Sequence, residues 1–350
     1  MTPSLVRRKD LLYGLFLAAV FATVLILVKA NSGTFPVANE DDVSFFIPAW
    51  NLAVFGDLGP TALNAPNGIY WVPHGFYLWI AVFLRLFGTT RGVALAVCAI
   101  STAAAVVLLL LGLVRVASSR SFATICAILL VSPATIYAAD TIRMESLILL
   151  LYAAAVWLHT RSRYILALAA LALSLLVHPA LSFSVVLYGL SWLAFAKFHR
   201  SSPAGAPTRS IVLSDVIVIS LVMLAFAAEM RLIFAHLELF RAHMVFQAQR
   251  KAGRTVADIM LHRRGVLLVA ESLVFVALGW AALDAAVGRR FLRELAPIGL
   301  MALGLQAYAA IGYETPYAVY SYSIVPATLL CTAYGTAVLI QSRLRSGERE

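Results

Sequence analysis

Three consecutive carboxylates, Glu40, Asp41 and Asp42, stand near the start of a chain in which 62% of the residues are hydrophobic. They lie in a long segment, residues 31–84, that contains no lysine or arginine. In so apolar a chain, an acidic cluster is costly unless water solvates it or the protein uses it. These side chains fit a general base, or the ligands of a divalent cation, at an interface with water. The alternative is a solvated loop in which Asp42 caps the following helix.

A second candidate site is the pair Arg143 and Glu145, which begins an otherwise apolar run. The guanidinium of arginine is planar and permanently charged, and its donors match the oxygens of a phosphate. One interpretation is therefore that Arg143 binds a phosphate group. The other is that Arg143 snorkels to a membrane interface and pairs there with a nearby acid.

His178 precedes Pro179 within an apolar stretch that is too long for one membrane span, residues 164–197. The proline breaks the helical pattern at this point. A single histidine at a helix end is more often a hydrogen-bonded structural residue than a catalyst. His178 is nevertheless a candidate, because we expect it on the same face as the carboxylates.

The fourth candidate is a basic cluster made of Arg250, Lys251 and Arg254. Its composition suits an anionic headgroup better than a solvated helix face. Tyr320 is expected on the same side and could close over a bound ligand. The alternative for Tyr320 is an aromatic belt at the membrane interface.

The overall composition predicts a membrane protein. The chain has 350 residues, of which only 13% are charged, and its mean hydropathy is +0.89. Soluble proteins carry about 25% charged residues. Apolar runs of about 15–25 residues recur along the chain, as in multi-pass helical proteins. No Walker loop, zinc-ligand spacing or other metal motif occurs, so the sequence does not support nucleotide hydrolysis.

We predict an all-α polytopic bundle of about ten spans, placed by hydrophobic periodicity and by the positive-inside rule. Two amphipathic helices, near residues 42–55 and 73–87, should lie in the interface plane within the first extracytoplasmic segment. The spans are expected at residues 10–29, 92–114, 121–138, 144–160, two within 164–197, 210–230, 265–284, 295–312 and 319–341.

This topology has a functional consequence. Short basic clusters fall on the cytoplasmic side, and the breaks that carry the candidate residues fall on the other. One break, residues 231–264, is basic although it should be extracytoplasmic. Either the predicted topology is wrong by one helix at this break, or an anionic ligand binds to the basic residues of the break. We favour the ligand, because removing one span would misplace the other basic clusters.

Five short motifs follow one another along the chain: Asp-Asp-x-x-Phe at residues 41–45, Pro-His-Gly-Phe-Tyr-Leu at 73–78, Leu-Phe-Gly at 86–88, Arg-Met-Glu at 143–145 and Leu-Val-His-Pro at 176–179. Taken in this order, they resemble the motifs of the GT-C superfamily of polytopic glycosyltransferases. The group that is most similar comprises the protein mannosyltransferases and the lipid A aminoarabinose transferases. The likeness covers residues 1–200, as a catalytic module, better than the more variable helices of residues 201–350. We expect a single domain over residues 1–350, with no separate soluble domain.

The resemblance implies an enzyme of a bacterial-type inner (plasma) membrane that acts on the extracytoplasmic face. It would transfer a sugar, with inversion, from a polyprenyl-phosphate donor to an acceptor glycan, lipid or protein. By likeness to the family motif, Asp41 is the catalytic carboxylate and Asp42 the second acidic position. A lysine common in the family is absent, with Val72 and His74 nearby. The alternative is a transporter or flippase for a lipid-linked sugar, which would not need Asp41 as a base.

Overall fold

The computed structural model is all-helical throughout the residues that it describes. These are residues 40–58, 73–117, 139–200 and 213–251, together with residues 12, 16, 19, 20, 23, 297, 300, 301 and 304. The helices are α2 (Glu40–Val54), α3 (Gly75–Phe87), α4 (Arg91–Ala117), α7 (Glu145–Thr160), α8 (Tyr164–Ser174), the short 3-10 helix η2 (Pro179–Leu181), α9 (Ser182–Arg200), α10 (Leu213–Ala235) and α11 (Leu237–Lys251).

The described part of the chain is therefore all α, as predicted. The helices expected at residues 92–114 and 144–160 correspond to α4 and α7. The predicted break at His178–Pro179 is also present, since α8 ends before it and α9 begins after it. Among the described helices, two segments, Arg91–Leu109 and Asp215–Ala235, are long and apolar enough to cross a membrane.

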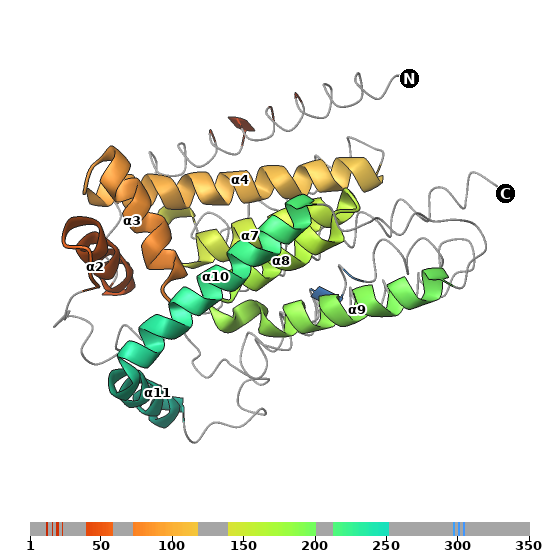
Figure 1. The fold of residues 1–350 in the computed structure, drawn as a ribbon. Helices are drawn as coiled ribbons and strands as arrows, with labels where there is room; N and C mark the ends of the chain where they lie inside the picture. The colour runs from red at the N-terminus through yellow and green to blue at the C-terminus, as the bar shows by residue number, and fades with distance from the viewer. Residues whose placement is uncertain are drawn as a thin grey trace.

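Helices α4, α7, α8, α9 and α10 form a bundle, and helices α2, α3 and α11 gather at one end of it (Figure 1). Helix α7 packs between α4 and α8, and α8 also contacts α9 and α10. Helix α3 packs against both α2 and α4, while α11 follows α10 directly. Helices α2, α3 and α11 thus lie at the same end, and the C-terminal ends of α4, α7 and α9 lie at the other.

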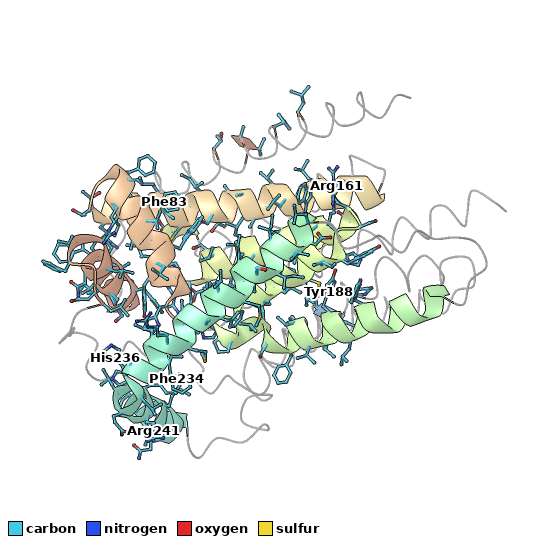
Figure 2. The ribbon with its side chains drawn as sticks, in the orientation of Figure 1. Phe83, Arg161, Tyr188, Phe234, His236 and Arg241 are labelled. Carbon is cyan, nitrogen blue, oxygen red and sulfur yellow. The ribbon has the colours of Figure 1, made fainter. Side chains whose placement is uncertain are left out.

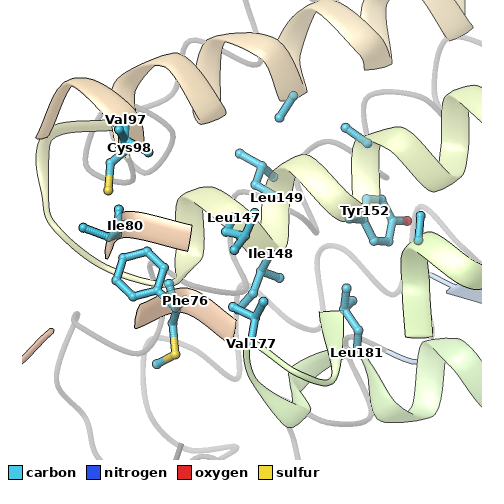
Figure 3. Close-up of a cluster of buried hydrophobic side chains, with 14 of the residues drawn as sticks. Phe76, Ile80, Val97, Cys98, Leu147, Ile148, Leu149, Tyr152, Val177 and Leu181 are labelled. Atoms are coloured by element: carbon cyan, nitrogen blue, oxygen red, sulfur yellow. The ribbon is translucent and has the colours of Figure 1, made fainter. Parts of the chain in front are cut away.

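The core connects α3 to the bundle (Figure 3). Phe76 and Ile80 of α3 are fully buried, as are Ile148 of α7 and Val177 of the break after α8. Helices α4 and α7 also bury several alanines, whose small side chains let two helices approach closely. The short helix α3 is consequently part of the packed core and does not merely rest on its surface.

The start of α3 is hydrogen-bonded to the break between α8 and α9. The backbone N–H of Gly75 donates a hydrogen bond of 2.7 Å to the carbonyl oxygen of Leu176. A Cβ atom at position 75 would lie only 2.5 Å from that oxygen. Glycine is therefore required at this crossing because any larger residue would displace one of the two backbones.

The end of α2 is held by Arg85 of α3. Its Nε donates to the carbonyl oxygen of Ala53 and its Nη2 to that of Leu52, each over 2.9 Å. The last carbonyls of a helix have no partner within the helix, and a basic side chain can satisfy them. Arg85 thereby fixes the angle between α2 and α3.

Two predictions about helix boundaries were wrong. Asp42 is not the N-cap of its helix, because α2 already begins at Glu40 and places all three carboxylates in its first turn. Within the basic segment 231–264, predicted as a break between spans, the described residues 231–251 are helical apart from His236: α10 continues to Ala235 and α11 follows. The position of the three acidic residues at the start of α2 is favourable, because negative charge in a first turn meets the positive end of the helix dipole.

The crossing at Gly75 generates a first prediction. Gly75→Ala should destabilise the protein by roughly 1–3 kcal/mol, the usual cost of overpacking, and should lower the melting temperature of the purified protein. Gly189→Ala in α9 is the control, since its Cβ would meet Leu168 at an ordinary 3.9 Å. That variant should melt at or above the wild-type temperature, because alanine favours a helix interior over glycine. Equal melting of Gly75→Ala and wild type would contradict the close approach.

Candidate active site

A buried ion pair marks the start of α7. Arg143 donates from Nε over 2.9 Å and from Nη2 over 2.8 Å to the same oxygen, Oε1 of Glu145. Only 2% of the arginine side chain and 1% of the glutamate side chain are exposed. Glu145 is the first residue of α7, where the helix dipole further stabilises a carboxylate. Arg143 therefore pairs with the expected acid, but in the protein interior and without snorkelling to a surface.

Helix α2 packs directly on this ion pair through Phe45. The guanidinium carbon of Arg143 lies 5.7 Å from the centroid of the Phe45 ring, within the range of a cation–π contact. Phe45 is buried and also contacts the rings of Phe76 and Tyr77, at 5.8 and 6.2 Å between centroids. Asp41 precedes Phe45 by one turn of α2. The motif at residues 41–45 thus meets the motif at residues 143–145.

A second buried polar pair joins α3 to α10. Nδ1 of His74 lies 2.9 Å from Oε1 of Glu229, and the two side chains are 3% and 8% exposed. The backbone N–H of His74 also donates toward both carboxylate oxygens, over 3.3 and 3.4 Å. The tautomer with hydrogen on Nδ1 suits this contact, because an ionised carboxylate only accepts hydrogen bonds. The two residues are 155 positions apart in the chain.

Tyr77 lies between the two polar pairs. Its ring is 6.1 Å from that of His74 and 6.2 Å from that of Phe45. Burial raises the pKa of Tyr77 far above its ordinary value, because the phenolate would lose its hydration. Tyr77 is consequently a neutral packing residue that links the two pairs.

His178 lies close to the same junction. Its side chain is buried, and its backbone N–H donates to the carbonyl oxygen of Ser174 over 2.9 Å. It follows by two residues the Leu176 carbonyl that receives the N–H of Gly75. The structure therefore brings His178, Arg143 and Glu145 to the end of the bundle where α2 and α3 lie.

The remaining predicted site residues are described only in part or not at all. The backbones of Asp41 and Asp42 lie in the first turn of α2, and those of Arg250 and Lys251 in the last turn of α11. Arg254 and Tyr320 fall outside the described residues. Among the described side chains, no three His, Cys, Asp or Glu residues gather closely enough to hold a metal ion.

Sequence reasoning did not select Glu229 or His74 as site residues. The available signal was an acidic residue inside an apolar run, which is costly unless the residue has a partner. Its partner could not be deduced, because it lies on an element far away in the sequence.

Different polar side chains lie at the two ends of the bundle. Figure 2 places His236 and Arg241 at the end formed by α10 and α11, and Arg161 and Tyr188 toward the other end. There, Nδ1 of His159 lies 3.0 Å from the hydroxyl of Tyr188, and both residues are buried. That polar pair lies away from the candidate site and joins α7 to α9.

Neither a family model, a curated protein nor a solved structure matches this chain.

The buried pair generates a second prediction. Arg143→Met should destabilise the protein by about 3–5 kcal/mol, because it leaves the Glu145 carboxylate buried and unpaired. The double variant Arg143→Met/Glu145→Leu should be more stable than either single variant, since it removes both charges. Thermal or chemical unfolding of the purified proteins measures these differences as a double-mutant cycle.

The control for that cycle is Arg241→Ala. Arg241 pairs with Glu238 over 3.2 Å on the surface of α11, where the side chains are 62% and 88% exposed. Its loss should change stability by less than about 1 kcal/mol. Additive effects of the two substitutions at Arg143 and Glu145 would show that the pair is not coupled.

Proposed function

We propose that this protein is a membrane glycosyltransferase of the GT-C type. It transfers a sugar from a polyprenyl-phosphate donor to an extracytoplasmic acceptor glycan, lipid or protein. The observation that carries the proposal is the contact between Phe45 and Arg143. Two motifs that resemble the family, nearly 100 residues apart in the sequence, are adjacent because of this contact, with a carboxylate-bearing helical turn next to it.

The exposed surface of α10 supports the proposal that the bundle is inserted in a membrane. Helix α10 exposes large apolar side chains around most of its circumference, including Leu213, Leu224 and Phe234. Such a surface would be unstable in water but is normal against lipid. We extend this to an inner-membrane bundle of about ten spans, as the apolar runs of the sequence predict.

The sidedness follows from the charges at the ends of the bundle. The C-terminal parts of α4, α7 and α9 carry or precede the basic residues Arg115, Arg161 and Arg200. These ends lie opposite α2, α3 and α11 (Figure 1). By the positive-inside rule we assign the end with α2 and α3 to the extracytoplasmic face, and we attribute the basic residues of α11 at that same end to phosphate binding.

In the proposed reaction, Asp41 is the general base. It accepts the proton of an acceptor hydroxyl while that oxygen forms a bond to the anomeric carbon of the sugar. The bond between the anomeric carbon and the phosphate oxygen breaks, and polyprenyl phosphate leaves with the electron pair. Because attack and departure occur on opposite faces, the configuration inverts. Asp42 supports Asp41 from the neighbouring position.

The leaving phosphate needs positive charge nearby. Arg250, Lys251 and Arg254 on and after α11 are the residues we assign to it. Arg143 is buried and bound to Glu145, so a direct contact with phosphate would require their ion pair to open. We therefore assign Arg143 a positioning role: it holds Phe45, and with it α2, at the start of α7.

Replacing each carboxylate tests the proposal. Purified wild-type protein should transfer radiolabelled sugar from a polyprenyl-phosphate donor to membranes of cells that lack the protein. Asp41→Asn should lower the rate by roughly 10²–10⁴-fold, the usual contribution of a general base. Asp42→Asn should lower it less. Glu40→Gln, at the adjacent acid, is the matched control and should keep near wild-type activity. Full activity of Asp41→Asn would contradict the assignment.

A further inference from the structure

We propose that Glu229 is a positioning residue of the transfer site. Through His74, its carboxylate fixes α10, and so the basic helix α11 that follows, relative to α3. This inference rests on the proposed function, since it assigns the donor phosphate to the basic residues of α11. It adds a residue pair that the sequence motifs do not contain.

Glu229 is well placed to hold α3 in position. Its carboxylate accepts from both the ring and the backbone N–H of His74, the residue that immediately precedes α3. The first N–H groups of a helix have no partner inside the helix, and they attract negative charge. The next N–H, that of Gly75, is bound to Leu176. The start of α3 is thus tied by hydrogen bonds to α10 and to the break after α8.

Helix α10 has few other buried attachments. Among its described side chains, the buried residues are Asp215, Val222 and Glu229, spaced seven residues apart. This spacing forms a narrow seam along one face of the helix, while most of the remaining surface is exposed. Glu229 is the last of the three and lies nearest to α11. Its contact with His74, together with the packing of the partly buried Leu232 against the core, positions the C-terminal end of α10.

The position of helix α11 depends on the C-terminal end of α10. Only His236 separates α10 from α11, and its carbonyl oxygen accepts the backbone N–H of Phe240 over 2.9 Å. Phe240 in turn packs against the hydrophobic core. A shift at Glu229 would consequently move Arg250 and Lys251 at the far end of α11 relative to α2 and α3.

This role predicts a specific kinetic effect. Glu229→Ala should raise the KM for the polyprenyl-phosphate donor by roughly tenfold or more, because misplaced binding groups lose much of their effect. The kcat should fall by a smaller factor. A residue that merely stabilises the fold would instead reduce the amount of active protein and leave the donor KM unchanged.

The experiment compares variants of the full-length protein in nanodiscs, with the radiolabelled polyprenyl-phosphate sugar as the donor. His74→Ala should reproduce the rise in KM, and the double variant should be no worse than either single one. His74→Asn should restore much of the affinity, because its amide can donate to Glu229 from nearly the same place. Glu238→Gln is the control, because its exposed carboxylate pairs with the exposed Arg241 on the surface of α11. If Glu229→Ala fails to fold, Glu229→Gln takes its place. Its donor KM should also rise, but by a smaller factor.

Two results would overturn the inference while leaving the proposed function intact: a donor KM unchanged in a folded Glu229 variant, or additive effects of the two substitutions. Absence of any transfer by the wild-type protein would instead overturn the proposed function, and the inference with it. The wild-type measurement therefore distinguishes the two failures.

Discussion

The cost of burying charge governs the candidate active site. Arg143 and Glu145 lie in the interior at the start of α7, where either charge would be uncompensated without the other. Phe45 of α2 packs over the guanidinium of Arg143 and so joins α2 to this pair. The position of the carboxylate-bearing turn of α2 is thus set by an interaction that begins a different helix, far along the chain.

The rest of the site follows from satisfying backbone and buried polar groups. Arg85 binds the last carbonyls of α2, Leu176 binds the N–H of Gly75, and Glu229 binds the N–H and ring of His74. Each contact joins elements distant in the sequence, and each lies where a helix begins or ends. Helix termini are the places where backbone groups lack partners, which explains why the tertiary contacts concentrate there.

Much of the described fold was predictable from the sequence, because apolar runs, a proline break and a helix-ending glycine are local signals. Residues Pro179 and Gly88 mark boundaries that the structure contains. The start of α2 was misplaced, since a run of three acids offers several equivalent caps. The pair of His74 and Glu229 could not be predicted, because nothing local indicates which buried acid meets which helix start.

The fate of the donor lipid distinguishes a transferase from a flippase most directly. Purified wild-type protein in proteoliposomes would receive a polyprenyl-phosphate sugar and an acceptor membrane extract, and mass spectrometry would follow the lipid. The proposal predicts that free polyprenyl phosphate forms in an amount equal to the sugar transferred. Movement of intact donor to the other leaflet, with no polyprenyl phosphate released, would contradict it.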